Sequence, residues 1–199
     1  MPTLEWIGKS KVINHHQDVP FRVLERKYSF DENGQHDEDN GSENMIIRGD
    51  NLEALKALLP RYEGRVKCIY IDPPYNTGND FVYEDDFAED TDSYMARSGQ
   101  YDEQGNRLVQ NADSNGRFHT DWLNMIYPRL RVAKDLLTED GVIVISIDDD
   151  EVENMRKCCN EIFGEANMIN CFIWNCSTAG GIRPKFASKT HEYILVLSL

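Results

Sequence analysis

The sequence lacks the features that mark membrane and secreted proteins. No apolar run approaches the roughly 20 residues that cross a bilayer. The amino end carries charged and polar residues where a signal peptide needs an apolar stretch. We therefore expect a cytoplasmic protein with no membrane partner. Its 199 residues, 40% of them hydrophobic, are enough to bury the core of one domain.

Paired cysteines are also missing. The five cysteines are an odd number, and none of them forms a CxxC pair, which disfavours both a zinc site and a disulfide framework. We predict reduced, mostly buried thiols and no bound metal. The cysteines in question are Cys68, Cys158, Cys159, Cys171 and Cys176.

An excess of basic residues is absent as well. The 21 Lys and Arg residues against 35 Asp and Glu residues give a net charge of −14, whereas proteins that grip DNA unaided offer a basic face to its phosphates. Half of the imbalance lies between residues 80 and 117, where ten acidic and three basic residues contribute −7. Such a run is typical of a solvated loop, so we expect residues 76–119 to form an acidic mobile loop.

Ordered patterns begin after residue 44. Residues 1–44 are largely polar and predict an extension with weak local structure, whereas apolar runs and helical spacings alternate in residues 45–199. The alternation predicts an α/β domain with a mainly parallel sheet and an antiparallel edge, because no helical pattern separates the last two strands. The expected strands are residues 45–48, 66–71, 142–147, 169–174 and 193–197, and the expected helices are residues 50–60, stopped by Pro60, 120–137, bent by Pro128, and 148–163.

Polar chemistry falls at the carboxyl end of the second strand, where ligands bind in open sheets of this kind. There the sequence reads Asp72-Pro73-Pro74-Tyr75. The Asp72 carboxylate and the Pro73 carbonyl can each accept a hydrogen bond from a planar exocyclic amine, while Tyr75 is placed to stack on the base. Such an amine is unreachable in a duplex, so the base must first be extruded. The alternative interpretation is a rigid turn after a strand, which two prolines often make.

Five segments, in their order along the chain, closely resemble the modification subunit of type III restriction-modification systems. This resemblance implies a circularly permuted, Rossmann-like DNA adenine N6-methyltransferase that uses S-adenosylmethionine, binds DNA, pairs with a restriction subunit and forms a homodimer. The segments are residues 48–52, 69–78, 127–130, 141–149 and 191–196.

The resemblance also implies roles for single residues. Asp72, Pro73, Pro74 and Tyr75 would be catalytic. Asp50, Asn51 and Asp72 would bind the cofactor, and Tyr75, Asn76 and His191 the target base. From the residues alone, Asp50 is equally a helix N-cap, and a histidine beside a strand is more often structural.

One part of the family pattern is missing. The family carries a Phe-x-Gly-x-Gly loop for the methionine part of the cofactor after the segment at residues 191–193, and Gly180-Gly181 is no substitute because no helix follows it. We therefore expect residues 45–199 to be a partial catalytic domain with an incomplete sheet, inactive alone, whose strand 66–71 lacks a neighbour. Cytosine-N4 methylation, RNA methylation and an inactive binding or assembly subunit are the alternative functions.

Overall fold

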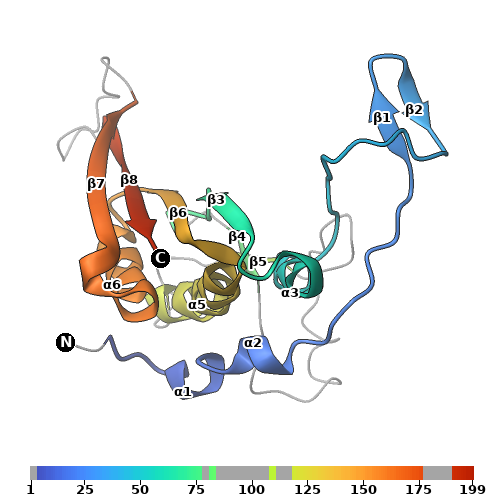
Figure 1. Ribbon diagram of the computed structural model, residues 1–199. Helices are drawn as coiled ribbons and strands as arrows, with labels where there is room; N and C mark the ends of the chain where they lie inside the picture. The colour runs from blue at the N-terminus through green and yellow to red at the C-terminus, as the bar shows by residue number, and fades with distance from the viewer. Residues whose placement is uncertain (1–3, 78–80, 84–107, 111–117, 177–189) are drawn as a thin grey trace.

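The computed structural model describes residues 4–77, 81–83, 108–110, 118–176 and 190–199. Two short helices and a small hairpin come first, and a sheet with its helices makes up the rest (Figure 1). The elements are α1 (Lys9–Val12), α2 (His15–Asp18), β1 (Ser29–Asp31), β2 (Gly34–His36), α3 (Asn51–Tyr62), β3 (Val66–Ile71), β4 (Phe81–Tyr83), β5 (Leu108–Gln110), α5 (Phe118–Leu136), β6 (Leu137–Ile147), α6 (Val152–Phe163), the 3-10 turn η1 (Glu165–Asn167), β7 (Met168–Asn175) and β8 (His191–Ser198).

The central sheet has the strand order β3-β6-β8-β7. Strands β3 and β6 are parallel, while β8 runs antiparallel to both β6 and β7. The predicted α/β class and the antiparallel edge are therefore confirmed. The sheet is mixed rather than mainly parallel, since one of its three pairings is parallel. The strand expected at residues 45–48, which a helix separates from β3, would have been a further candidate for parallel pairing, but it does not form.

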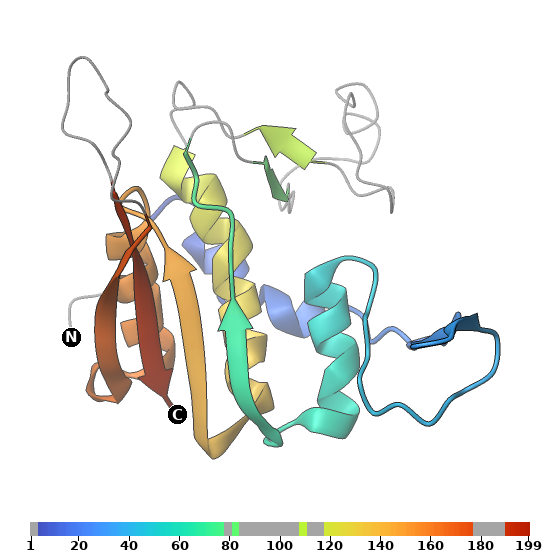
Figure 2. The same cartoon turned by 90° about the horizontal axis from the view of Figure 1, so that it is seen from above.

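Helices α5 and α6 cover one face of this sheet (Figures 1 and 2). Alternate residues of β6, Ile143, Ile145 and Ile147, are fully buried against them because side chains along a strand alternate between its two faces. The opposite face carries exposed aromatic rings: Tyr70 is 64% exposed and Trp174 is 60% exposed. The hydrophobic core of the domain thus lies between the sheet and this helical layer.

The strand expected at residues 45–48 does not form. These residues have no strand conformation, and Ile46 is 95% exposed. A strand is stable only with a partner, and β3, the edge of the sheet, pairs with β6 alone among the described strands. The apolar run at residues 45–48 therefore was not sufficient to make a strand, and the prediction was wrong.

Helix α3 runs two residues past its predicted stop at Pro60, ending at Tyr62. A proline near a helix end removes one backbone donor only, and the following turn still closes because Glu63 N–H donates to the Leu59 carbonyl at 3.0 Å. Helix α5 begins at Phe118, two residues before the predicted start, and contains Pro128.

The first residues of the chain pack onto the domain more closely than a weakly structured extension suggests. Trp6 Nε1 donates to Asn124 Oδ1 of α5 at 2.7 Å, and Val12 is fully buried. Lys9 is 4% exposed, and its ammonium group donates to Glu161 Oε2 of α6 at 2.8 Å. Residues 4–19 therefore belong to the packed body of the protein, and the prediction of weak structure suits only the exposed hairpin β1-β2.

The cysteines are all free thiols, as predicted, but only Cys158 and Cys159 are buried. Cys171 is half-buried, and Cys68 and Cys176 are exposed, so the expectation of mostly buried thiols was wrong. The predicted mobility of residues 76–119 concerns positions that lie mostly outside the described residues. Within the described ranges, no helix is both long and apolar enough to cross a bilayer.

Candidate active site

The Asp-Pro-Pro-Tyr motif lies at the end of the sheet where the ends of β3, β6 and β8 lie side by side. Ile71 at the end of β3 pairs with Ile145 of β6, and Ile147 at the end of β6 pairs with Tyr193 near the start of β8. Because β8 is antiparallel, its amino end meets the carboxyl ends of β3 and β6. Asp72 and His191 are thereby brought to the same end of the sheet.

The Asp72 side chain is exposed to solvent rather than directed into the core. Its Oδ1 accepts a hydrogen bond from the Ser146 hydroxyl at 2.7 Å, and Ser146 in turn accepts one from the Tyr70 hydroxyl at 3.2 Å. Among the residues that the structure describes, none donates to Asp72 Oδ2 or to the Pro73 carbonyl. The exposed Asp72 therefore presents one acceptor atom without a described donor, and the next residue, Pro73, is itself buried.

The rest of the turn is held rigidly. Trp122 of α5, which is fully buried, donates its indole N–H to the Pro74 carbonyl at 2.7 Å. The half-buried Tyr75 donates its hydroxyl to Glu192 Oε2 of β8 at 3.2 Å. Burial, together with the nearby carboxylates, raises the pKa of Tyr75 to about 12. The Tyr75 ring is thus an uncharged aromatic surface at neutral pH, fixed at its hydroxyl end.

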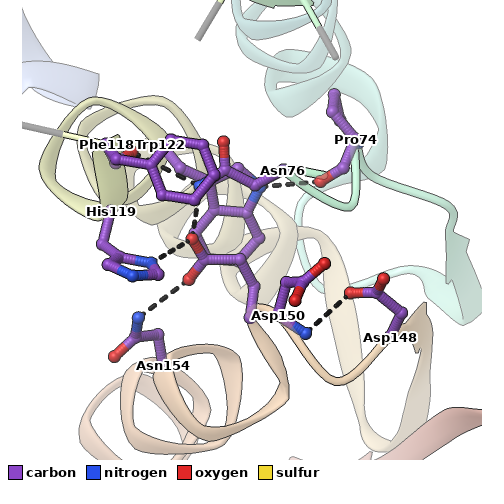
Figure 3. A network of polar contacts seen from close by, with 9 residues as sticks. Pro74, Asn76, Phe118, His119, Trp122, Asp148, Asp150 and Asn154 are labelled. Carbon is purple, nitrogen blue, oxygen red and sulfur yellow. Dashed lines mark hydrogen bonds and ion pairs between the residues drawn. The ribbon is translucent and has the colours of Figure 1, made fainter. Parts of the chain in front are cut away.

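A buried carboxylate holds the end of the Asp-Pro-Pro-Tyr turn. Glu151, which directly precedes α6, is fully buried and accepts hydrogen bonds from Asn76 Nδ2, His119 Nδ1 at 2.7 Å and Asn154 Nδ2 at 2.8 Å. Figure 3 shows the Asn76, His119 and Asn154 side chains converging on one point. Asn76 is itself fully buried and has a φ of 62°, a conformation that asparagine tolerates better than most residues.

Asn76 and α5 enclose a long stretch of sequence. Asn76 Nδ2 also lies 3.3 Å from the Phe118 carbonyl, 42 positions further along the chain. Both ends of the stretch between Asn76 and Phe118 therefore meet beside Glu151. The same carboxylate holds the end of the Asp-Pro-Pro-Tyr turn and the first turn of α5.

The predicted cofactor residues cap a helix. Asp50 Oδ1 accepts hydrogen bonds from the backbone N–H groups of Leu52 at 2.9 Å and Glu53 at 3.0 Å, which makes Asp50 the N-cap of α3. Asp50 Oδ2 lies 3.6 Å from the guanidinium of Arg129, and the Asn51 side-chain oxygen accepts a hydrogen bond from the same Arg129. Helix α3 and strand β3 run in opposite directions and are joined by a short connection. The amino end of α3 therefore lies level with the carboxyl end of β3 (Figure 2).

His191 has polar neighbours within the protein. Its Nε2 lies 3.1 Å from the Tyr193 hydroxyl and 3.7 Å from Asp149 Oδ1, and Tyr193 donates to Asp149 at 2.9 Å. This last hydrogen bond raises the pKa of Tyr193. A structural role for His191 is therefore visible, and base binding by His191 stays a prediction. The described residues contain no group of three potential metal ligands.

Sequence reasoning missed three residues that shape this site. The sequence pattern places Ser146 in a strand and Trp122 on a helix face, and neither position carries a motif. Glu151 follows three aspartates, and in the sequence it looks like one more solvated acid. Of these three residues, only Ser146 is distinguished by the sequence. It alternates with Ile145 and Ile147, so its side chain points to the other face of the strand, one position before the strand ends.

Comparisons with known proteins agree with the motif. A family model described as DNA methylase matches residues 66–198. The chain is 37% identical over 195 residues to the type III restriction-modification enzyme EcoP15I Mod subunit of Escherichia coli. It is 38% identical over 195 residues to the EcoPI Mod subunit of Escherichia phage P1. Each alignment covers 98% of this chain and 30% of the relative.

A further relative is the type II methyltransferase M.KpnI of Klebsiella pneumoniae, 34% identical over 158 residues, or 79% of this chain and 33% of that protein. The resemblance to type III modification subunits is thus confirmed. The chain spans about a third of the length of these curated relatives.

Proposed function

Because the chain belongs to the DNA methylase family, we propose that it carries the catalytic turn of a site-specific DNA adenine N6-methyltransferase. The observation that carries this proposal is the exposed Asp72 at the carboxyl end of β3, whose Oδ1 is held by Ser146 and whose Oδ2 has no described donor. Two acceptors in adjacent residues match the two N–H bonds of one exocyclic amine.

The two acceptors address the chemical difficulty of the reaction. The amino lone pair of adenine is delocalised into the ring, and the amine must become more nucleophilic before it can attack. Hydrogen bonds from its two N–H groups to Asp72 and Pro73 favour a pyramidal nitrogen with a localised lone pair. Holding the amine in line with the methyl group contributes most of the remaining rate gain, about 7 to 11 kcal/mol for well-oriented reactants.

Tyr75 stabilises the extruded base. A base stacked on an aromatic ring gains about 1 to 3 kcal/mol, which offsets part of the cost of unstacking it from the duplex. The neutral phenol suits this role because its pKa of about 12 keeps charge away from the ring. We assign target-base contact to Tyr75 and His191, whereas the fully buried Asn76 would act on base binding indirectly, by holding the turn through Glu151.

The methyl donor in this proposal is S-adenosylmethionine, which supplies an electrophilic methyl group on a sulfonium sulfur. Residues at the amino end of α3 fit its adenosine part. Asp50 Oδ2 is not used by the helix cap and can accept a hydrogen bond, and a Cβ placed on Gly49 would meet nothing within 4 Å, so space is open there. Asp50 and Asn51 would hold the adenosine, and Asp72 would lie between it and the base.

We further propose that the protein works in a type III restriction-modification system, in a Rossmann-like catalytic domain of a cytoplasmic homodimer that binds DNA and a restriction subunit. The identity to two Mod subunits over nearly the whole chain supports this assignment. The net charge of −14 makes this chain a poor surface for phosphates, so the proposal places most backbone contacts to DNA on other surfaces of the full-length protein.

Replacing Asp72 with alanine tests the proposal. In the full-length protein, Asp72→Ala should abolish transfer of labelled methyl groups to DNA while leaving S-adenosylmethionine and DNA binding measurable. Mass spectrometry of nucleosides from DNA modified by the wild type should show N6-methyladenine. Methyl transfer that survives in Asp72→Ala would refute the assigned chemistry, and N4-methylcytosine would instead assign the same turn to cytosine.

A further inference from the structure

Ser146 lies beside Asp72 for a geometric reason. Ile71 pairs with Ile145 in the parallel register of β3 and β6, so the next residues along the two strands, Asp72 and Ser146, stand side by side. Side chains alternate along a strand, and since Ile145 points toward the helices, Ser146 points to the opposite face. Ser146 is 5% exposed, which makes it a buried hydroxyl at the mouth of the candidate site.

The hydrogen bonds around Ser146 have one consistent direction. A serine hydroxyl has a single hydrogen and two lone pairs. The Tyr70 hydroxyl lies 3.2 Å away and donates to Ser146 Oγ, so the Ser146 hydrogen is left for an acceptor. Asp72 Oδ1 at 2.7 Å is a better acceptor than the Ile71 carbonyl at 3.4 Å, because it is charged and closer.

We propose that Ser146 is a positioning residue that fixes the rotation of the Asp72 carboxylate and so directs Oδ2 at the amine of the target base. With Oδ1 engaged by Ser146 at 2.7 Å, the carboxylate cannot turn freely about its Cβ–Cγ bond, and Oδ2 keeps one direction. The inference rests on the proposed function, since it takes Asp72 as the acceptor of the amine. It adds the residue that orients that acceptor.

Positioning of this kind has a kinetic signature. Without the Ser146 hydroxyl, the base can still enter and stack, but fewer bound complexes present both acceptors to the amine. The loss therefore falls on kcat, while the KM for DNA and the dissociation constant of S-adenosylmethionine change little. A residue that only supported the fold would lower the melting temperature and affect these constants together.

The test compares three variants of the full-length protein in methylation of a DNA duplex with S-adenosylmethionine. Ser146→Ala should lower kcat about tenfold to hundredfold, the loss expected for one hydrogen bond to a charged group. Ser146→Thr, which keeps a hydroxyl, should recover most of this loss. The control Ser198→Ala, which removes a serine hydroxyl at the far end of the same sheet, should leave kcat within about twofold of the wild type.

The outcomes separate this inference from the function beneath it. If Ser146→Ala keeps the wild-type kcat while Asp72→Ala is inactive, the positioning role is overturned and the proposed function stands. If Asp72→Ala is itself active, both are overturned. A Ser146→Ala protein that loses its circular dichroism spectrum, or a Ser146→Thr protein as slow as Ser146→Ala, assigns Ser146 to folding and also overturns the inference.

Discussion

Replacing Glu151 with alanine should destabilise the protein and loosen the Asp-Pro-Pro-Tyr turn. The fully buried Glu151 carboxylate accepts hydrogen bonds from Asn76, His119 and Asn154. When the carboxylate is removed, the three donors differ in whether water can replace it as their acceptor. His119 has a side chain that is 55% exposed and can donate to water in place of Glu151. Asn76 is fully buried and keeps its contact with the Phe118 carbonyl at 3.3 Å, but it loses its charged acceptor.

The expected magnitude follows from that difference. A hydrogen bond to a charged acceptor contributes about 1.5 to 3 kcal/mol, and burial keeps water from replacing it, so Asn76 and the half-buried Asn154 together lose more than His119 does. Removing the carboxylate also relieves its own desolvation cost, which offsets part of the loss. We expect Glu151→Ala to lower the free energy of unfolding by about 2 to 4 kcal/mol, Glu151→Gln by about 1 to 2, and His119→Ala by less than about 1.

Urea unfolding followed by tryptophan fluorescence measures this order. Trp122 is fully buried and its indole N–H contacts the turn, so the probe reports on the region under test. Amide hydrogen exchange should also become faster at Tyr75 and Asn76 in Glu151→Ala. The reasoning is refuted if Glu151→Ala is as stable as the wild type, or if His119→Ala is as destabilised as Glu151→Ala.

Two further predictions concern buried polar groups elsewhere in the fold. Burial raises the pKa of the Cys159 thiol from its ordinary 9.0 to about 12, so its contribution to stability is complete below pH 9 and is lost as the pH rises toward 12. Cys159 should therefore contribute a fall of about 1 to 2 kcal/mol in unfolding free energy between pH 8 and pH 10 in urea titrations, and Cys159→Ala should reduce the slope by that amount, leaving the part due to Cys158, whose pKa burial also raises. Lys9→Met should cost about 1 to 3 kcal/mol, because it breaks the ion pair with Glu161 that ties residues 4–19 to α6. An unchanged urea midpoint would show that this contact contributes nothing.

The sequence predicted those elements whose pattern is intrinsic. Strands β6, β7 and β8 were each recognisable from an apolar run, and the antiparallel edge followed from the missing helix between the last two. The strand expected at residues 45–48 failed because the same kind of run forms a strand only where a neighbour supplies hydrogen bonds. Local pattern identifies a candidate strand, and tertiary pairing decides whether it forms.

The site was predictable to the same extent. Asp72 and Tyr75 were identified because their spacing after a strand carries chemical meaning. Glu151 was not identified, because the sequence does not show whether a glutamate is buried or solvated. Only three-dimensional packing distinguishes the two cases. Two of the three described partners of Glu151 are far away in sequence, Asn76 by 75 positions and His119 by 32. The helix and strand periodicities of a sequence relate only residues a few positions apart, so they cannot predict contacts over such separations.

The meeting of Asn76 and Phe118 beside one carboxylate has a consequence for how such a chain can evolve. A segment whose two ends are anchored at a common point can gain or lose residues at a closure cost that grows only slowly with its length. Insertions between Asn76 and Phe118 would leave unchanged the register of the sheet and the orientation of the Asp-Pro-Pro-Tyr turn. This junction is therefore the natural place for related proteins to differ in length while keeping the same chemistry.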